Sequence, residues 1–419
     1  MINYNNKGEV KMSKKTVLMI LFGIVIISNC QKKTNIALPK LIPYTENSIV
    51  WGFCDKNKNV VIKPVYEYVE PFVNGFARVS KDDKFGFINE EGKEIVPLKY
   101  NLIKSPFNRS LVAVGKKLSE NESKEKKSDY IWAYVNNNGE EIIPFGYIDA
   151  RSFTLNRALV KKYLKKEDDF AWGYIDQNGK EVTKFIYDFR SESFFNGLAR
   201  VGISKRISGS NFYNYEYNYF YSFIDTSGNV IIPPEKLNYS NIEVFQEERA
   251  LVRNDKYGFI DTSGDLVIPM IYKDARHFRE GLAAVKLEDK WGFIDKNGDT
   301  VIDFKYSYVH PFNEGLARIA IDTTVSNLDY VGYIDKSGEL FLPYNYFAGY
   351  SFVDSIAVVK IRGRSNYSVI NRLGKELFSF DEKLEYFNYV GNGLFEVGVN
   401  RNRESIKIGY VDIRGKEYY

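Results

Sequence analysis

One short pattern of hydrophobic and polar positions recurs along almost the whole chain. It consists of an aromatic, a small residue, an aromatic, an aliphatic, then Asp or Asn, followed by a turn, two aliphatic residues and often Pro. A recurrence of this kind predicts a repeat protein whose units stack on one another. Ten copies, 34 to 49 residues apart, begin at Trp51, Phe85, Trp132, Trp172, Tyr221, Tyr257, Trp291, Val331, Tyr367 and Ile408.

Each copy predicts β-strands, because aromatic and β-branched residues dominate it. In the seventh copy, Trp291 to Ile294 forms one expected strand and Asp299 to Ile302 another. A second phrase follows at Phe312 to Ile319, reading Phe-Asn-Glu-Gly-Leu-Ala-Arg-Ile. Its alternation of apolar and polar residues predicts a third strand.

The turn between the first two strands is unusually well specified. Asp or Asn ends the first strand in all ten copies, and Gly follows three residues later in nine of them, Lys58 being the exception. An Asx side chain can cap its own turn, and Gly tolerates a positive φ on the return side. We therefore interpret these positions as structural turn residues, not as acids, bases or metal ligands. Representative pairs are Asp176 with Gly179, Asp261 with Gly264, and Asp295 with Gly298.

The Trp-Gly-Phe-Ile-Asp-x-x-Gly hairpin followed by Phe-x-x-Gly-Leu-Ala resembles the bacterial WG-repeat (KWG) family. The resemblance covers nearly all of residues 50–419. It implies an all-β repeat array and, usually, no assigned activity. Copies with Val331 or Ile408 at the first position, and with Ala133, Ser222 or Ser368 at the Gly position, depart from the pattern.

The expected fold class is all-β, a tandem array of about ten three-stranded units. A unit of three short strands cannot bury its aromatic face alone, so neighbouring units must share one core. An open solenoid or a propeller-like toroid would satisfy this requirement. Ten units exceed the usual four to eight blades of a propeller, and three strands fall short of the usual four, which favours the open form. Completion of the last unit by Leu41 to Val50 is the alternative.

The N-terminus is typical of an exported protein. Lys14 and Lys15 precede an uncharged, mostly apolar run from Thr16 to Ser28, which is too short for an ordinary transmembrane helix. Residues 1–29 are predicted to be a signal peptide, with Met12 as an alternative start. The run ends in Ile27-Ser28-Asn29-Cys30, which resembles a bacterial lipobox apart from Asn29.

This resemblance implies lipidation of Cys30, a tether over residues 30–48 and the repeat array over 49–419. The protein is then expected to be lipid-anchored in the bacterial cell envelope, at the outer membrane or surface rather than the inner membrane. An uncleaved hydrophobic anchor and a signal peptide cut elsewhere are the alternatives.

Composition narrows the functions further. The net charge is +4 with acids and bases interspersed, which disfavours nucleic-acid binding. Cys30 and Cys54 are the two cysteines. Cys54 stands where other copies carry Ile or Val, so we interpret it as a small core residue.

No motif for catalysis, metal binding or a cofactor stands out, so an enzyme is not expected. His277 and His310 occupy non-equivalent positions and lack metal-ligand spacing. We interpret both as ordinary surface or half-buried histidines.

The lengths of the copies differ mainly between the third strand and the next aromatic strand, so insertions should project from one edge of the array. The insertion from Ile203 to Phe220 alternates Tyr with Asn, a composition found in many binding surfaces. Its tyrosines are the candidate binding residues: Tyr213, Tyr215, Tyr217 and Tyr219. A lengthened edge hairpin whose rings pack on the neighbouring unit is the structural alternative.

The favoured function is a non-enzymatic, lipid-anchored scaffold that binds a protein or glycan. The alternatives are a carbohydrate-binding or carbohydrate-processing protein that uses exposed aromatics, and a spacer without a specific ligand.

Overall fold

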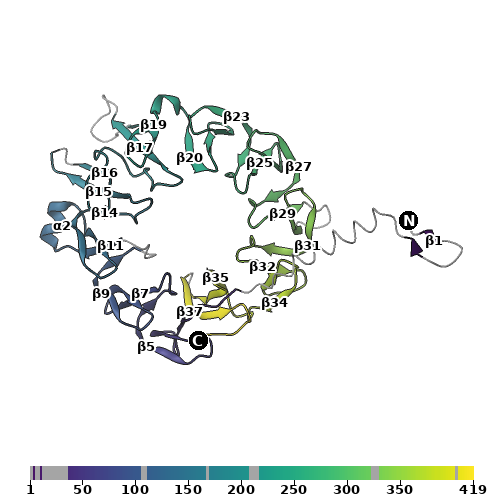
Figure 1. Ribbon diagram of the computed structural model, residues 1–419, viewed down its shortest axis with the longest axis horizontal. Coiled ribbons are helices and arrows are strands. Elements are labelled where there is room, and N and C mark those ends of the chain that lie inside the picture. The colour runs from purple at the N-terminus through teal and green to yellow at the C-terminus, as the bar shows by residue number, and fades with distance from the viewer. Residues whose placement is uncertain are drawn as a thin grey trace.

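The array folds into a ring of small antiparallel sheets around an open centre (Figure 1). The computed structural model describes residues 3–4, 10–11, 36–104, 111–166, 169–206, 217–321, 330–401 and 404–419. These residues form ten consecutive sheet units, which we call blades 1 to 10. The all-β repeat architecture expected from the sequence is therefore confirmed.

Six blades contain four strands, the eighth and ninth sharing strand β31 in one continuous sheet. In chain order they are blade 2, with β6 (Tyr68–Val69), β7 (Phe76–Lys81), β8 (Lys84–Asn89) and β9 (Glu94–Tyr100); blade 3, with β10 (Leu102–Ile103), β11 (Leu111–Lys117), β12 (Tyr130–Asn136) and β13 (Glu141–Tyr147); blade 6, with β20 (Asn241–Gln246), β21 (Arg249–Arg253), β22 (Tyr257–Ile260) and β23 (Leu266–Tyr272); blade 7, with β24 (Asp274–Ala275), β25 (Ala283–Leu287), β26 (Lys290–Ile294) and β27 (Thr300–Tyr306); blade 8, with β28 (Tyr308–Val309), β29 (Ala317–Ile321), β30 (Tyr330–Ile334) and β31 (Leu340–Gly349); and blade 9, with the end of β31, β32 (Ile356–Ile361), β33 (Ser368–Asn371) and β34 (Glu376–Ser379).

The other four blades contain three strands each. They are blade 1, with β3 (Ile42–Tyr44), β4 (Trp51–Cys54) and β5 (Val60–Tyr66); blade 4, with β14 (Asp149–Ala150), β15 (Ala158–Leu164) and β16 (Asp169–Ile175); blade 5, with β17 (Leu198–Arg206), β18 (Tyr217–Asp225) and β19 (Val230–Ile232); and blade 10, with β35 (Tyr386–Gly391), β36 (Leu394–Arg401) and β37 (Glu404–Asp412). Outside the ring lie β1 (Asn3–Tyr4) and β2 (Val10–Lys11), and the connections include helix α2 (Glu120–Lys126) and the 3-10 helix η1 (Pro234–Lys236).

Each blade takes its strands from two consecutive repeats. The strand that carries the Gly-Leu-Ala phrase, such as β25, pairs with the aromatic strand of the next copy, here β26. A short strand such as β24 adds a fourth member that the sequence did not predict. Figure 1 places β9, β23 and β27 on the outer side of the ring and β20, β29 and β32 nearer the centre.

The Gly of the aromatic-Gly motif is required by a bulge in the neighbouring outer strand. Trp291 pairs with Tyr306 and Phe293 pairs with Ile302. Between these two pairs β27 therefore has two more residues than β26, which forms a bulge opposite Gly292. This bulge pushes the backbone towards the glycine, and a Cβ there would lie 2.6 Å from the Ile302 carbonyl oxygen. In blade 5, Ser222 replaces the Gly, and its hydroxyl donates a hydrogen bond of 2.8 Å to the Ile232 carbonyl.

Pairs of aromatic rings join neighbouring blades. The third residue of the motif contacts the Phe of the Phe-x-x-Gly turn, or of the turn that corresponds to it, in the next blade, with ring centroids 4.7 to 5.0 Å apart. Seven such pairs occur among the described residues: Phe53–Phe72, Tyr134–Phe153, Tyr174–Phe194, Phe223–Phe245, Phe259–Phe278, Phe293–Phe312 and Tyr333–Phe352. The hydroxyls of Tyr134, Tyr174 and Tyr333 each donate to a backbone carbonyl of the next blade, as Tyr333 does to Tyr350 at 2.7 Å.

The Asx residues form the hairpin turns. The Asp295 Oδ1 atom accepts hydrogen bonds of 2.9 Å from the backbone N–H groups of Asn297 and Asp299. Gly298 has a φ of 91°. Lys58 replaces this glycine in the first copy and also adopts a positive φ, 71°.

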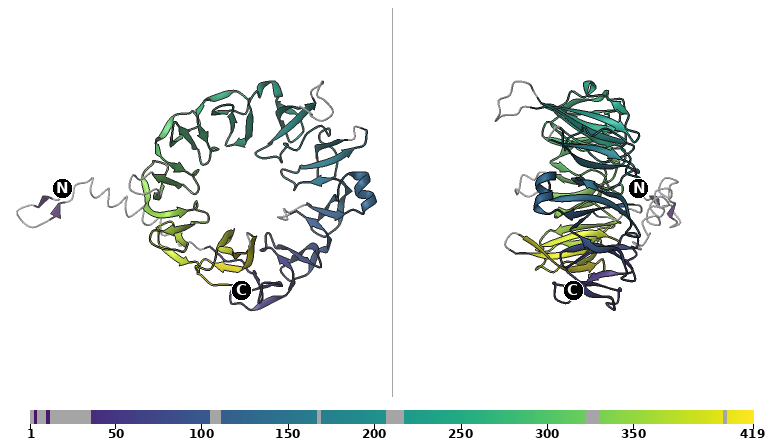
Figure 2. Two further views of the ribbon diagram at one scale, coloured as in Figure 1. Left: turned by 180° about the vertical axis from the view of Figure 1, so that it is seen from behind. Right: turned by 90° about the vertical axis from the view of Figure 1, so that its left-hand side faces the viewer.

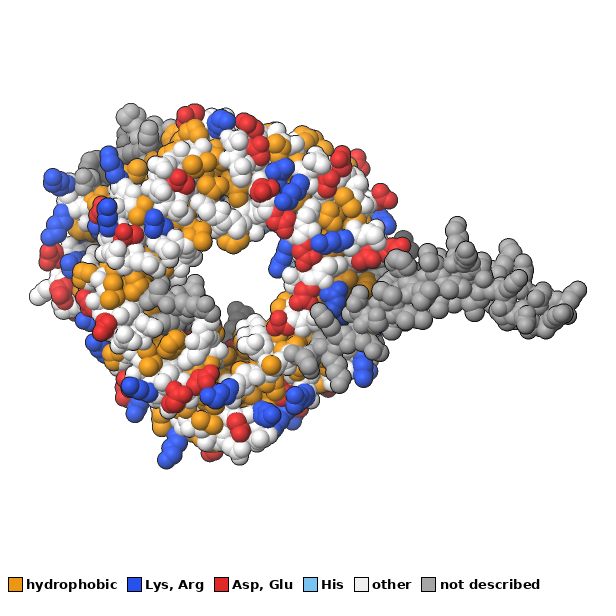
Figure 3. Space-filling view, viewed as in Figure 1, with side chains coloured by type: hydrophobic (Ala, Val, Ile, Leu, Met, Phe, Trp, Pro, Cys, Tyr) orange, Lys and Arg blue, Asp and Glu red, His pale blue; other side chains and the backbone are white. Residues whose placement is uncertain are grey.

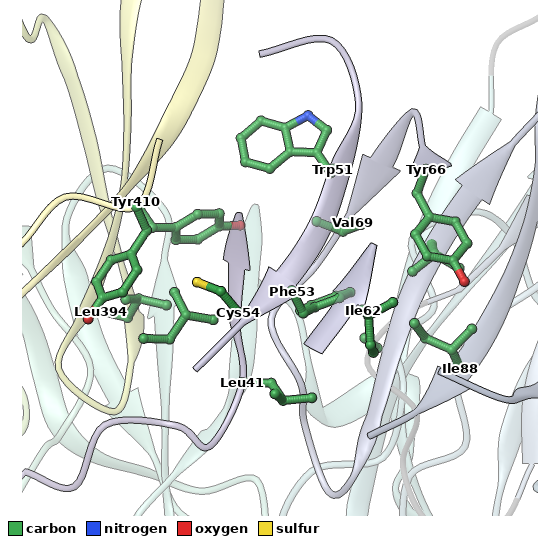
Figure 4. Close-up of a cluster of buried hydrophobic side chains, with 14 residues drawn as sticks. Leu41, Trp51, Phe53, Cys54, Ile62, Tyr66, Val69, Ile88, Leu394 and Tyr410 are labelled. Atoms are coloured by element: carbon green, nitrogen blue, oxygen red, sulfur yellow. The ribbon is translucent and has the colours of Figure 1, made fainter. Parts of the chain in front are cut away.

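The two ends of the array meet, so the preference for an open solenoid is wrong. One buried cluster contains Leu41, Trp51 and Cys54 from the start of the array together with Leu394 and Tyr410 from its end (Figure 4). Closure takes place without strand exchange, because blades 1 and 10 are each built from their own segment of the chain. The open form was expected because each repeat predicts three strands and because ten blades exceed the usual number. In the structure, an inner strand gives six blades a fourth strand, and the ring is wide enough to hold ten blades.

Cys54 lies inside this seam with no exposed surface and no disulfide partner. Burial raises the pKa of its thiol to about 11. A protonated thiol of this kind packs as a small apolar side chain.

The bulge argument gives a first prediction. Gly292→Ala should lower the free energy of unfolding by about 1–3 kcal/mol, because the new Cβ overlaps the backbone of β27. Gly146→Ala is the control, since the nearest atom to a Cβ there is 3.9 Å away. We expect the control to change stability by less than about 0.5 kcal/mol. Urea unfolding of both variants measures the difference, and equal effects would contradict the bulge explanation.

Candidate functional site

Blade 5 departs from the regular blades in its outer strand. Strand β19 has three residues, whereas β23 and β27 have seven. Pro233 and Pro234 follow β19 directly and start η1. Proline has no N–H to donate to a sheet. A proline at the position of Pro233 also lies inside β23, as Pro269, so the second proline, Pro234, distinguishes blade 5, where the pairing stops.

The early stop leaves one edge of β18 open. Strand β18 pairs with β17 along its full length, from Tyr217 to Asp225. On its other side it pairs with β19 only at Phe223 and Ile224. Among the described residues, no strand therefore pairs with the outer side of β18 before Phe223.

A pocket of about 520 Å³ lies beside this open edge. Its walls include Tyr219 and Phe220 of β18 and Pro234, Leu237 and Tyr239 of the connection to blade 6. Tyr219 is 54% exposed and Phe220 is 38% exposed. Glu235 and Asn238 also line it, so the pocket combines polar and apolar walls with accessible aromatic rings.

A buried ion pair lies against one face of the Tyr219 ring. The Arg190 guanidinium lies 3.8 Å from the centre of the Tyr219 ring and 5.3 Å from that of Tyr221. Asp188 holds the guanidinium through an ion pair, and both side chains are at least 85% buried. The neighbouring Phe189 is 72% exposed. Arg190 therefore fixes one face of Tyr219 while leaving the ring accessible.

The other residues predicted from the sequence are placed as follows. Tyr213 and Tyr215 lie outside the described residues, as does Cys30, and Tyr217 lies at the start of β18. The structure does not bring the turn residues together into one site, because each lies in the hairpin of its own blade. They are Asp176, Gly179, Asp261, Gly264, Asp295 and Gly298.

Sequence reasoning missed Phe189, Arg190, Leu237 and Tyr239, which come from segments flanking the Tyr-rich insertion. The Pro233-Pro234 pair was a usable signal, because it indicates a shortened strand and hence an open edge. Nothing in the sequence indicates that Arg190 lies under Tyr219.

The sequence was compared with known proteins. A family model described as the WG containing repeat matches eight times, at residues 51–85, 85–117, 132–163, 172–204, 221–256, 257–291, 291–322 and 332–364. These matches cover well over half of the chain. The chain belongs to the WG-repeat family. The remaining copies, at Tyr367 and Ile408, form the same kind of hairpin in blades 9 and 10.

Comparison with curated proteins gave no match. Among solved structures, the WG-repeat ring is similar to a quinonprotein alcohol dehydrogenase-like protein from Bacteroides thetaiotaomicron, with 12% identity, a TM-score of 0.31, and coverage of 74% of this chain and 82% of that one. It is also similar to the extracellular domain of a putative one component system from B. thetaiotaomicron, with 9% identity, a TM-score of 0.28, and coverage of 90% and 69%.

Within the described part of the chain, no helix is long and apolar enough to cross a membrane. No group of three or more His, Cys, Asp or Glu side chains among those residues could hold a metal ion.

The two histidines of the WG-repeat ring lie in adjacent blades. His277 Nε2 is 2.5 Å from Glu243 Oε2 of the preceding blade, and the histidine side chain is 33% exposed. His310 follows β28 and packs against the Tyr308 ring, with centroids 5.2 Å apart. Burial, aided by the nearby charges of Arg318 and Arg276, lowers the pKa of His310 to about 4.

This shift predicts how stability depends on pH. Between its ordinary pKa of about 6.5 and the folded value of about 4, His310 binds a proton in the unfolded chain but not in the folded one. Stability should therefore fall as the pH is lowered through this window. His310→Gln should reduce the loss in unfolding free energy between about pH 7 and about pH 5, measured by urea titration. An unchanged loss would show that other groups control the acid response.

Proposed function

We propose that this WG-repeat ring is a non-enzymatic, lipid-anchored scaffold of the bacterial cell envelope that binds a protein through the open edge of β18. One observation carries the proposal: a strand edge that pairs with no other described strand before Phe223, a pocket and accessible aromatic rings lie together in blade 5. An unpaired edge presents backbone donors and acceptors that an extended segment of another protein can satisfy by adding a strand. The pocket would then receive a side chain of that segment.

The arrangement of the insertions supports a single binding face. Insertions fall in the hairpins between the Gly-Leu-Ala strand and the aromatic strand, such as the hairpin from β11 to β12 that contains α2. Because the blades are equivalent, these hairpins point the same way. Figure 2 shows α2 on the same side of the disc as the long ends of β17 and β18. A partner approaching from this side would meet the hairpins before the rest of the ring.

The charges leave the chemistry of the partner broad. Acidic and basic side chains are interspersed over the face seen in Figure 3, and the net charge is +4. Long-range electrostatic steering is therefore weak, and recognition would rest on shape, backbone pairing and the rings of Tyr219 and Phe220. A glycan stacked on Tyr219 is the second candidate, because that ring is fixed on one face and exposed on the other.

The proposal places the anchor at Cys30, on the basis of the lipobox-like sequence. Cells grown with an alkyne-labelled fatty acid should incorporate the label into the wild-type protein, and Cys30→Ser should abolish it. Cys54→Ser is the matched control, because Cys54 is the other cysteine of the chain and should leave the label intact. Label retained by Cys30→Ser would refute lipidation at this position and leave the binding face to be tested separately.

The binding face is tested by placing a photo-crosslinking amino acid at position 219 of the protein in its native cells. We expect a discrete crosslinked partner at this position, which mass spectrometry identifies. The same amino acid at position 195 is the control, since Phe195 is also an exposed aromatic of blade 5, 44% accessible, but lies outside the pocket.

With the identified partner purified, Phe220→Ala should weaken binding by about tenfold or more, which corresponds to about 1.4 kcal/mol. Phe195→Ala should leave binding unchanged. Equal crosslinking at both positions, or equal affinities of both variants, would refute the site. Specific binding of a purified glycan, lost in Tyr219→Ala, would instead support the second candidate.

A further inference from the structure

A second irregularity lies on another part of the ring, between blades 9 and 10. In the preceding seam, Tyr333 of blade 8 and Phe352 of blade 9 form the usual ring pair, and Phe352 packs in the same buried cluster as Leu316, which precedes β29. Phe352 belongs to the turn that corresponds to Phe-x-x-Gly, with Ser355 at the Gly position, so this turn covers the inner part of the preceding blade. Both rings of the pair are missing in the next seam.

The first ring is replaced by a smaller side chain. Val369 occupies the motif position that Tyr333 holds in blade 8, as shown by its pairing with Val358, which corresponds to the pairing of Tyr333 with Arg318. The second ring is lost with its turn. Residues 310–316 connect β28 to β29, whereas only residues 392–393 connect β35 to β36. Blade 10 therefore has no Phe-x-x-Gly turn to lay against blade 9.

Loss of the turn uncovers the wall of β32 that faces blade 10. A pocket of about 270 Å³ opens there, lined by Tyr350, Ile356, Val358, Phe387, Tyr389 and Phe395. Phe380 stacks on Phe387 with centroids 4.9 Å apart and an interplanar angle of 12°, and so supports one wall of the pocket. The opening is thus a consequence of the altered repeat.

The walls of this pocket are held in place without a ligand. The Tyr389 hydroxyl donates a hydrogen bond of 2.5 Å to Asp354 Oδ2 and accepts one of 2.9 Å from the Gly393 N–H. The Tyr350 and Phe387 rings meet nearly at right angles, 85°, with centroids 6.1 Å apart. A flat ring placed against both walls can stack on one and meet the edge of the other, which are the two favourable aromatic geometries.

No charged side chain lines the pocket. The position of Val358 varies around the ring. Blades 2 and 5 carry Arg78 and Arg200 there, and each donates a hydrogen bond to a backbone carbonyl of the next blade, whereas blades 6 and 7 carry Leu251 and Ala284. In blade 9 the residue is Val358, which is 8% exposed. The polar side chains at the pocket are Ser351 and Asn388, together with the Tyr hydroxyls.

We propose that the pocket between blades 9 and 10 binds an uncharged single aromatic ring of the phenol or benzyl type. The volume, the perpendicular ring walls and the uncharged lining all favour such a group. A pyranose is disfavoured, because its hydroxyl groups surround the ring and most would be buried without partners. The ring could belong to a free small molecule or to a side chain of another protein, since the recognised chemistry is the same.

The test uses the full-length protein and p-cresol, followed by ligand-observed saturation-transfer NMR. A small ring in a pocket of this kind should bind with a dissociation constant on the order of 1 mM. Glucose at the same concentration should give no saturable signal. Binding of p-cresol alone would support a free ligand, and binding of N-acetyltyrosine amide as well would support a side chain.

Two variants assign the signal to the pocket. Val358→Arg introduces the residue that blades 2 and 5 carry at this position, and Asn388→Trp places a large side chain at the exposed rim. Each should weaken p-cresol binding by about tenfold or more. Leu373→Trp, at a 59% exposed position of blade 9 outside the pocket, is the control and should bind normally. Circular dichroism confirms that each variant is folded.

The proposal fails if p-cresol does not bind the wild-type protein saturably, if glucose binds in its place, or if Asn388→Trp binds p-cresol as tightly as the control. It stands apart from the face on blade 5, because the two pockets lie in different seams and share no residue. Either can therefore fail while the other holds.

Discussion

The contact between two aromatic rings, seen across seven of the blade interfaces, is the interaction on which this WG-repeat ring depends. A blade of three or four short strands turns both faces towards neighbours, so it cannot bury its aromatic residues alone. Phe312 of one blade lies 4.8 Å from Phe293 of the blade before it, and both are fully buried. Burial of each such side chain contributes roughly 1.5–3 kcal/mol. Stability is therefore distributed over nearest-neighbour contacts, as in other repeat proteins.

A chain of such contacts leaves a free face at each end, and the ring closes because these two faces fit. Inside the array, the motif Trp receives a cation from the inner edge of its own blade, as Trp291 does from Arg276 at 4.9 Å. In blade 1, Thr45 follows the inner strand and offers no charge. Lys407 of blade 10 supplies it instead, 4.5 Å from the Trp51 ring, and pairs with Glu396 at 3.2 Å. Burial lowers the pKa of Lys407, and the contacts with Glu396 oppose that shift.

The features that could be predicted from the sequence are those determined within a single hairpin. The Asx residue, the glycine three positions later and the alternation of the strands follow from local backbone geometry, and the structure shows them in place. The pairing of strands across two repeats and the meeting of the ends were not predicted, because they depend on small rotations between blades that add up around the ring. In the candidate site, the Tyr-rich insertion marked β18, but the support of Tyr219 by Arg190 depends on how two distant segments pack.

Both proposed binding pockets lie where the sequence departs from the repeat pattern. These departures therefore indicate where a protein built from similar units binds its ligands. A regular blade such as blade 7 packs two rings into its interface and pairs its outer strand on both sides of the bulge. The second proline, Pro234, accompanies the loss of outer pairing in blade 5, whereas Val369 and the missing turn remove the ring pair next to blade 10. The two losses have different results: the first exposes backbone groups that suit a protein strand, and the second exposes an apolar wall that suits a ring. A regular array thus provides stability, and its individual departures provide distinct surfaces for binding.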